Sequence, residues 1–138
     1  MINKITSFFA LFLFSSLSYS EEYALGFVSD VSFIYPKISS FQDINKEAAS
    51  KYILRLKGAL DAYDLGVSNN DIKDISRKGC DVEGLYFFLR YQEKVAGDIM
   101  LCLSSSCESH ETNRIKYNIA SDRTSKKLSE CTKALDLN

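Results

Sequence analysis

The residue types best suited to metal binding or catalysis lie in one polar stretch that contains Cys102, Cys107 and His110. Thiolates and an imidazole are zinc ligands, and Glu108 or a third cysteine would complete a tetrahedral set. However, four residues separate the two cysteines, whereas compact structural zinc sites use the shorter Cys-x2-Cys spacing. The chain also begins with a targeting segment, and cysteines of exported proteins usually oxidise. We therefore expect no metal ion and no cofactor.

His110 is the only histidine in the chain, so a serine hydrolase mechanism would have to use it as the base. Serines occur at 104–106 and at 109, but no Gly-x-Ser-x-Gly elbow is present to hold a nucleophile. A histidine in a polar loop is usually solvated. We expect no catalytic residue and a protein that is not an enzyme, with a small hydrolase that uses His110 as a remote alternative.

Paired carboxylates would suit glycoside hydrolysis, and Glu83, Glu93 and Asp98 fall on one polar face of a predicted helix. A charged helical face is more often simply solvated, and nothing in the sequence places these groups in a cleft. The six glycines are scattered singly, so no P-loop and no dinucleotide fingerprint is present.

The four cysteines, Cys80, Cys102, Cys107 and Cys131, predict two disulfides in an exported chain. If Asp81–Leu103 is one helix, Cys80 and Cys102 stand about 33 Å apart. A disulfide needs Cα atoms within about 7 Å, so this pair is excluded. If the last helix packs antiparallel on the central one, Cys131 returns to the vicinity of Cys80, and Cys102 is left to pair with Cys107. We favour this pairing, Cys80–Cys131 with Cys102–Cys107. Cys80–Cys107 with Cys102–Cys131 remains the other option.

The stretch Asp81–Leu103 is the predicted central helix, with Asp81 as its N-cap. Its polar and apolar residues separate onto opposite faces at 100° per residue, and only Gln92 is polar on the apolar side. Residues Glu22–Tyr35 fit a strand or a helix, and we favour a helix that Pro36 ends, because a lone strand would have no partner.

Three further helices complete the prediction. Ser39–Leu65 begins with a capping box, Ser39 with Gln42, and is followed by Gly66 as a C′ glycine. A short connecting helix, with an Asn cap and a closing glycine, spans Asn69–Gly79. The last helix carries an apolar stripe, although part of it also fits a short strand. The stripe is Leu128, Cys131 and Leu135, and the strand candidates are Ile115, Tyr117 and Ile119.

The predicted fold is all-α: a small disulfide-stapled helical bundle of four main helices and one short connecting helix, forming a single domain over residues 21–138. Residues 1–20 resemble a signal peptide cleaved after Ser20, with Lys4 followed by an apolar core of about ten residues, too short to span a membrane. We expect a periplasmic or secreted protein that is not inserted in a membrane after cleavage.

The charge balance argues against some partners. The formal net charge of the whole chain is −1, and loss of Lys4 makes it one unit more negative. Nucleic acids and anionic membrane surfaces need a basic footprint, which this composition does not supply. We expect a protein partner, or a second copy of the chain in a homodimer.

Two places are candidates for contacting a partner: the polar run Ser104–Asn113, and two aromatic residues that fall toward the polar side of the central helix. The candidate partner-binding residues are Ser105, Ser106, Glu108, His110, Glu111, Tyr86 and Phe87.

The segment Ala48-Ala49-Ser50-Lys51-Tyr52-Ile53, followed by Gly58-Ala59-Leu60-Asp61-Ala62, resembles the central helix of small periplasmic immunity proteins. These proteins protect bacteria against the peptidoglycan-cleaving amidase effectors of type VI secretion. The resemblance covers about one helix. It implies an all-helical, disulfide-bonded, non-enzymatic inhibitor that neutralises a cell-wall-degrading effector by direct binding. A small secreted structural or interaction protein of the bacterial envelope, without an inhibitory role, is the alternative.

Overall fold

The computed structural model describes residues 23–39, 46–104, 108 and 110–137, and this part of the chain is helical with no strand. It forms the small helical bundle that the sequence predicts. The helices are residues 23–38, α2 (Lys46–Gly66), α3 (Asn69–Arg77), α4 (Val82–Ser104) and α5 (His110–Ala134). The predicted signal peptide lies outside the described residues.

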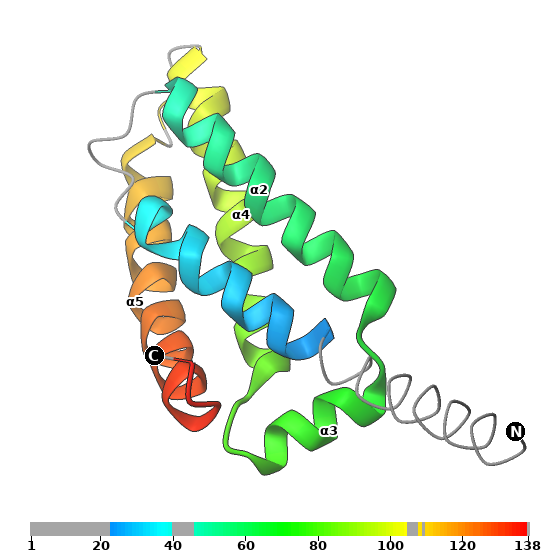
Figure 1. Cartoon of the computed structure of the whole chain (residues 1–138). Helices are drawn as coiled ribbons and strands as arrows, with labels where there is room; N and C mark the ends of the chain where they lie inside the picture. The colour runs from blue at the N-terminus through cyan, green and yellow to red at the C-terminus, as the bar shows by residue number, and fades with distance from the viewer. Residues whose placement is uncertain (1–22, 40–45, 105–107, 109, 138) are drawn as a thin grey trace, which may run out of the picture.

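Helix α4 is central to the arrangement, as Figure 1 shows. Of the labelled helices, α5 packs most extensively against it, followed by α2 and α3. The 23–38 helix crosses obliquely over α4 between α2 and α5, and α3 lies across one end of the bundle. Within the described helices, none has the length and apolarity that crossing a membrane requires.

The core consists of two apolar clusters along α4. The larger one gathers side chains from the 23–38 helix, α2, α3, the first half of α4 and the end of α5. The smaller one contains Val95, Ala96, Ile99 and Tyr117. Gln92 lies one turn from Leu89 of the larger cluster and is fully buried, in agreement with its position on the apolar face of the predicted helix.

The 23–38 helix confirms the preference for a helix over a strand, but it continues past Pro36, where we expected it to end. Hydroxyl groups of α5 explain the extension. Tyr117 donates a hydrogen bond to the Ile38 carbonyl, and Ser121 Oγ donates one of 2.8 Å to the Ser39 carbonyl. These bonds satisfy carbonyl groups that a helix end leaves without partners inside the helix.

The predicted start of the second helix is wrong. Ser39 belongs to the end of the preceding helix, where its N–H donates to the Tyr35 carbonyl at 2.9 Å, and α2 begins at Lys46. Gln42, the other half of the predicted capping box, lies outside the described residues. Gly66 is the last residue of α2, because the Val67 N–H still bonds to a carbonyl of that helix.

Helix α3 is capped one residue earlier than predicted. Ser68 is its N-cap and forms a capping box with Asp71, through bonds of 3.3 Å and 3.1 Å. The predicted closing glycine is confirmed: Gly79 follows the helix with a φ of +102°, a conformation that only glycine adopts without strain. This turn leads directly to Cys80.

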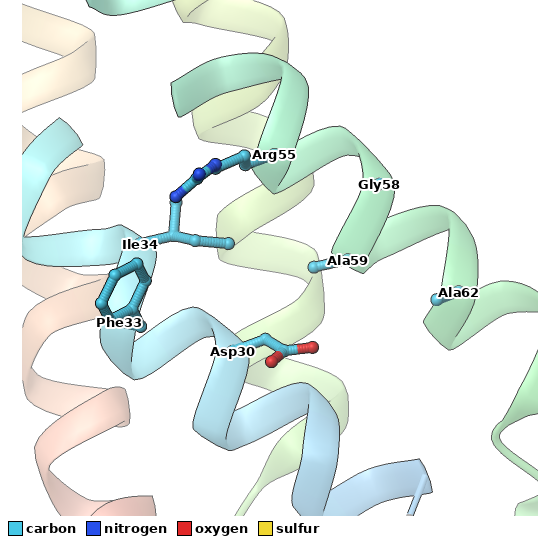
Figure 2. Close-up of a pocket in the computed structure, with 7 residues that line it drawn as sticks. All are labelled: Asp30, Phe33, Ile34, Arg55, Gly58, Ala59 and Ala62. Atoms are coloured by element: carbon cyan, nitrogen blue, oxygen red, sulfur yellow. The ribbon is translucent and has the colours of Figure 1, made fainter. Parts of the chain in front are cut away.

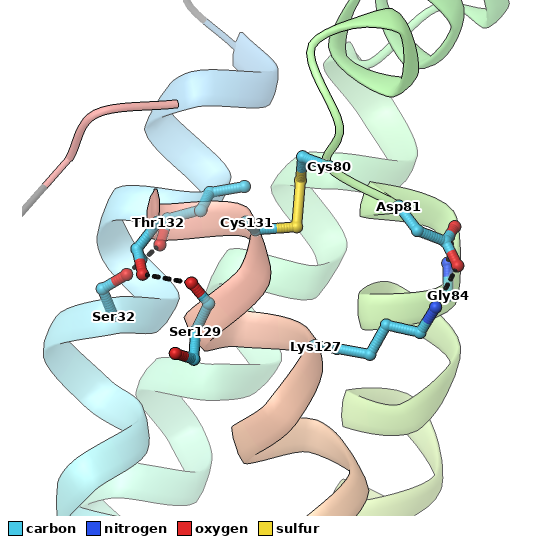
Figure 3. The surroundings of a disulfide bond; sticks show 9 residues. Ser32, Cys80, Asp81, Gly84, Lys127, Ser129, Cys131 and Thr132 are labelled. Carbon is cyan, nitrogen blue, oxygen red and sulfur yellow. Dashed lines mark hydrogen bonds and ion pairs between the residues drawn. A yellow bond between two sulfur atoms is a disulfide. The ribbon is translucent and has the colours of Figure 1, made fainter. Parts of the chain in front are cut away.

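The disulfide between Cys80 and Cys131 is present as predicted, with a Cα–Cα distance of 4.3 Å. Figure 3 shows how it joins the chain just before α4 to the last turns of α5. Both cysteines are fully buried. The continuous helix α4 confirms that Cys80 and Cys102 are too far apart to pair. Cys107, the predicted partner of Cys102, lies outside the described residues.

Asp81 caps α4 as predicted and also contacts α5. Its carboxylate accepts a hydrogen bond of 3.0 Å from the Gly84 N–H and pairs with Lys127 (Figure 3). The Lys127 ammonium group, and then the Gly84 N–H, lower the pKa of Asp81 below its ordinary value. The same end of the bundle is thus held by a covalent bond and by an ion pair.

Candidate protein-binding groove

The predicted polar loop is shorter than expected, because α5 already begins at His110. Glu108 is exposed, and Glu111 is exposed in the first turn of α5, where it pairs with Arg114 at 3.2 Å. His110 is half-buried, and its Nδ1 atom has no hydrogen-bond partner among the described residues. Ser105 and Ser106 lie outside the described residues.

The carboxylates considered for chemistry do not converge with a histidine. Glu93 accepts a hydrogen bond of 2.9 Å from Arg90, whereas Glu83 and Asp98 are exposed. Within the described ranges, no group of three His, Cys, Asp or Glu side chains is placed to hold a metal ion.

Tyr86 belongs to the contact between α2 and α4. Its ring stacks on Tyr63 with a centroid distance of 4.4 Å, and its hydroxyl donates a hydrogen bond of 2.6 Å to Asp64. Arg90 joins the same contact through ion pairs with Asp64 at 2.6 Å and Asp61 at 2.9 Å. The hydrogen bond from Tyr86, followed by that from Arg90, lowers the pKa of Asp64. The ring and the hydroxyl group of Tyr86 therefore both take part in contacts within the chain.

Phe87, the other predicted aromatic, meets the Tyr86 ring edge-on at a centroid distance of 5.7 Å and is still 62% exposed. It lines a groove of about 400 Å³ between α4 and α5. We call this feature the α4–α5 groove. Its lining residues are Phe87, Phe88, Tyr91, Lys116, Ile119, Ala120 and Arg123.

The two helices contribute different chemistry to the α4–α5 groove. Helix α4 supplies three aromatic rings, and α5 supplies aliphatic side chains and cations. Tyr91 and Ile119 remain about half exposed, at 45% and 51%, while Ala120 is only 3% exposed and lies deepest. The spacing of these residues at one helical turn on each helix places them along the same side of the pair.

All formal charges among the described lining residues are positive. A smaller hollow of about 230 Å³ shares Phe88 and Arg123 with the groove and is also lined by Lys126, Lys127 and Glu130. Lys127 is paired with Asp81. Among the residues that the structure describes, no carboxylate lies within the 4.0 Å ion-pair distance of Lys116, Arg123 or Lys126. The groove therefore combines an apolar surface with cations that form no ion pair with a described carboxylate.

A second groove, of about 350 Å³, lies between the 23–38 helix and α2 (Figure 2). It differs in charge, because Asp30 stands on the 23–38 helix and Arg55 reaches from α2 toward Ile34. Among its described lining residues Phe33 is the only aromatic one, and most of the α2 side consists of glycine and alanine. The α4–α5 groove offers more aromatic surface and a single sign of charge.

The sequence predicts Phe87 as a contact residue but does not predict the α5 half of the groove. The signal was present in the isoleucines Ile115 and Ile119, which we considered as part of a strand. In the structure they lie on α5, and both are more than half exposed. Two isoleucines one turn apart on the exposed side of a polar helix indicate a surface that contacts something else.

The chain matches no protein-family model, and no curated protein and no solved structure matches it.

Proposed function

We propose that this protein is an exported binding protein whose partner protein docks in the α4–α5 groove. The observation that carries the proposal is the exposure of Phe87, Tyr91 and Ile119 around one concave surface. Aromatic residues and arginine dominate the energetics of protein interfaces, particularly where side chains of the partner can enter a pocket.

The packing of the two helices that form the groove supports this proposal. Helices α4 and α5 pack extensively on each other and are tied at one end by the Cys80–Cys131 disulfide. A preformed surface loses little conformational freedom on binding, which favours affinity. The disulfide is also compatible with an oxidising compartment outside the cytoplasm, where the predicted signal peptide would direct the chain.

We further propose that binding neutralises a cell-wall-degrading effector. This part rests on the resemblance of residues 48–62 to periplasmic immunity proteins. An envelope protein that binds a partner without inhibiting it is the alternative, and the two differ in whether the partner's enzymatic activity falls on binding.

The test compares Ile119→Asp with Leu65→Asp, using protein that begins at residue 21. Both substitutions place a carboxylate at an exposed aliphatic position, but Leu65 is 91% exposed on α2 and lies outside the groove. Each variant is immobilised and exposed to periplasmic extract from cells that are under attack by competitors and from cells that are not. We expect a partner that the wild type and Leu65→Asp retain and that Ile119→Asp loses.

The retained partner is then assayed for peptidoglycan hydrolysis with and without the purified protein. Loss of hydrolysis supports the inhibitor, and full activity in the complex supports the alternative. Equal retention of every partner by both variants would contradict docking in the groove.

A further inference from the structure

We infer that the α4–α5 groove accepts an acidic amphipathic α-helix of its partner. The inference rests on the proposed function, and it adds the secondary structure and the charge of the docking segment. Its basis is the combination of an apolar surface between two packed helices with cations that have no counter-charge among the described residues.

The dimensions of the groove fit a short helix. The lining residues of α5 extend from Lys116 to Arg123, which corresponds to about 10 Å along a helix axis. Ile115 extends the apolar side by a further exposed side chain. A partner helix spans this distance in two turns, with apolar side chains at i, i+4 and i+7 facing the groove. This is the common helix-in-groove mode of recognition.

The charges determine which helix fits. Lys116 and Arg123 are separated by two helical turns on α5, with the apolar Ile119 and Ala120 between them. A docked helix that carries Asp or Glu beside its apolar face would place carboxylates near both cations. Lys126 lies in the adjoining hollow and adds a third cation there, although Glu130 also lines that hollow. A basic helix of the same apolar pattern would meet three like charges that form no ion pair with a described residue, so charge gives specificity here.

Two other occupants fit less well. A second copy related by a two-fold axis would bring the same patch of both copies together, and Lys116 and Arg123 would then face like charges. An anionic membrane would favour a protruding apolar surface, whereas Ala120 lies deep in the groove at 3% exposure. The whole chain also has a net charge of −1, which gives little general attraction to an anionic surface.

The experiment is a selection from a displayed library of 16-residue peptides, with protein from residue 21 onward as the target. The library fixes alanine-rich helical positions and randomises the remainder, so that both charge and apolar spacing are free to vary. Selected peptides are measured by fluorescence anisotropy against the wild type, Lys116→Glu/Arg123→Glu and the matched control Lys57→Glu/Lys73→Glu. The control reverses two exposed lysines on α2 and α3, which lie outside the groove.

We expect peptides with negative net charge and apolar residues at i, i+4 and i+7. Their affinity should fall at least tenfold in Lys116→Glu/Arg123→Glu, remain within twofold in the control, and weaken as salt rises. Peptides that bind the groove, as judged by loss in Ile119→Asp, but are not acidic would overturn the inference and leave the proposed function intact. If no selected peptide is sensitive to Ile119→Asp, both fail.

Vesicles of anionic phospholipid and sedimentation of the free protein complete the test. Vesicle binding that is lost in Lys116→Glu/Arg123→Glu, without any acidic peptide selected, would assign the groove to a membrane. Self-association that is lost in the same variant would assign it to a second copy. Either outcome overturns the inference.

Discussion

Gln92 places an amide side chain within the core of the bundle. Its side chain is fully buried, and neither its amide nitrogen nor its amide oxygen has a hydrogen-bond partner in the described part of the structure. Burial of an unpaired amide costs about 1–3 kcal/mol by mutational measures. The Gln92 side chain lies near the Tyr35 hydroxyl, which itself bonds to Ser121 near the end of the 23–38 helix.

Replacement of this amide by a thioether of similar shape tests its cost. We expect Gln92→Met to raise the free energy of unfolding by about 1 kcal/mol, because the apolar side chain removes the desolvation penalty and fills the same space. Urea unfolding measures the change, with Leu89→Met as the control for introducing methionine into a neighbouring apolar site. A loss of more than about 1 kcal/mol in Gln92→Met would show that the amide is satisfied in the folded protein.

At the scale of single helices, the sequence is informative where the physical cause is local. The extent of α4 follows from the separation of its polar and apolar residues, and its Asp81 cap follows from the residue type that precedes it. The extension of the 23–38 helix past Pro36 has a cause that is distant in sequence. The hydroxyl groups that donate hydrogen bonds to the carbonyls at its end belong to Tyr117 and Ser121 of α5. No local pattern contains that information.

The α4–α5 groove illustrates the same limit for the candidate site. Phe87 was identified because it falls toward the polar side of one helix. Lys116 and Arg123 were missed because their importance depends on how α5 is rotated against α4, which only tertiary packing determines. The buried pairing of Cys80 with Cys131 was predictable because a helix of known rise limits which cysteines can meet.

The contact of Asp81 with both α4 and α5 predicts a pH dependence. The pKa of Asp81 is lowered from 3.8, so its carboxylate stabilises the folded state above about pH 4, and this contribution is lost as the pH falls through the lower folded pKa. Asp81→Asn keeps an acceptor for the Gly84 N–H but removes the ion pair with Lys127. We expect a loss of up to about 1 kcal/mol at pH 7 that shrinks below pH 4.

Urea unfolding between pH 7 and about pH 3 measures this difference. Asp98→Asn is the matched control, since Asp98 is exposed on the same helix and takes part in no ion pair that the structure describes. A deficit of Asp81→Asn that stays constant over the whole pH range would contradict an electrostatic role and leave only the capping contribution.

For the whole molecule, the Cys80–Cys131 disulfide is the strongest single constraint. It closes a loop with a sequence separation of 51 and joins the start of α4 to the end of α5. In the chain-entropy model, a loop of this length stabilises the fold by about 4 kcal/mol. We expect Cys80→Ala/Cys131→Ala to lower the free energy of unfolding by about 3–4 kcal/mol, because the unfolded chain regains that freedom. Urea unfolding of oxidised protein measures the loss.

The comparison with Cys102→Ala/Cys107→Ala makes this prediction specific to the long loop. If Cys102 and Cys107 pair as the sequence predicts, they close a much shorter loop, and their removal should cost less. Because Cys80 and Cys131 are both fully buried, a reductant should reach the long bridge only when the native protein opens. The rate of its reduction should therefore follow the rate of unfolding and slow in any variant that unfolds more slowly. Equal losses in the two double variants would mean that this bridge does not hold the α4–α5 pair together. Reduction of the native protein as fast as that of an exposed disulfide would mean the same. The groove in which we propose that a partner docks would then need another source of rigidity.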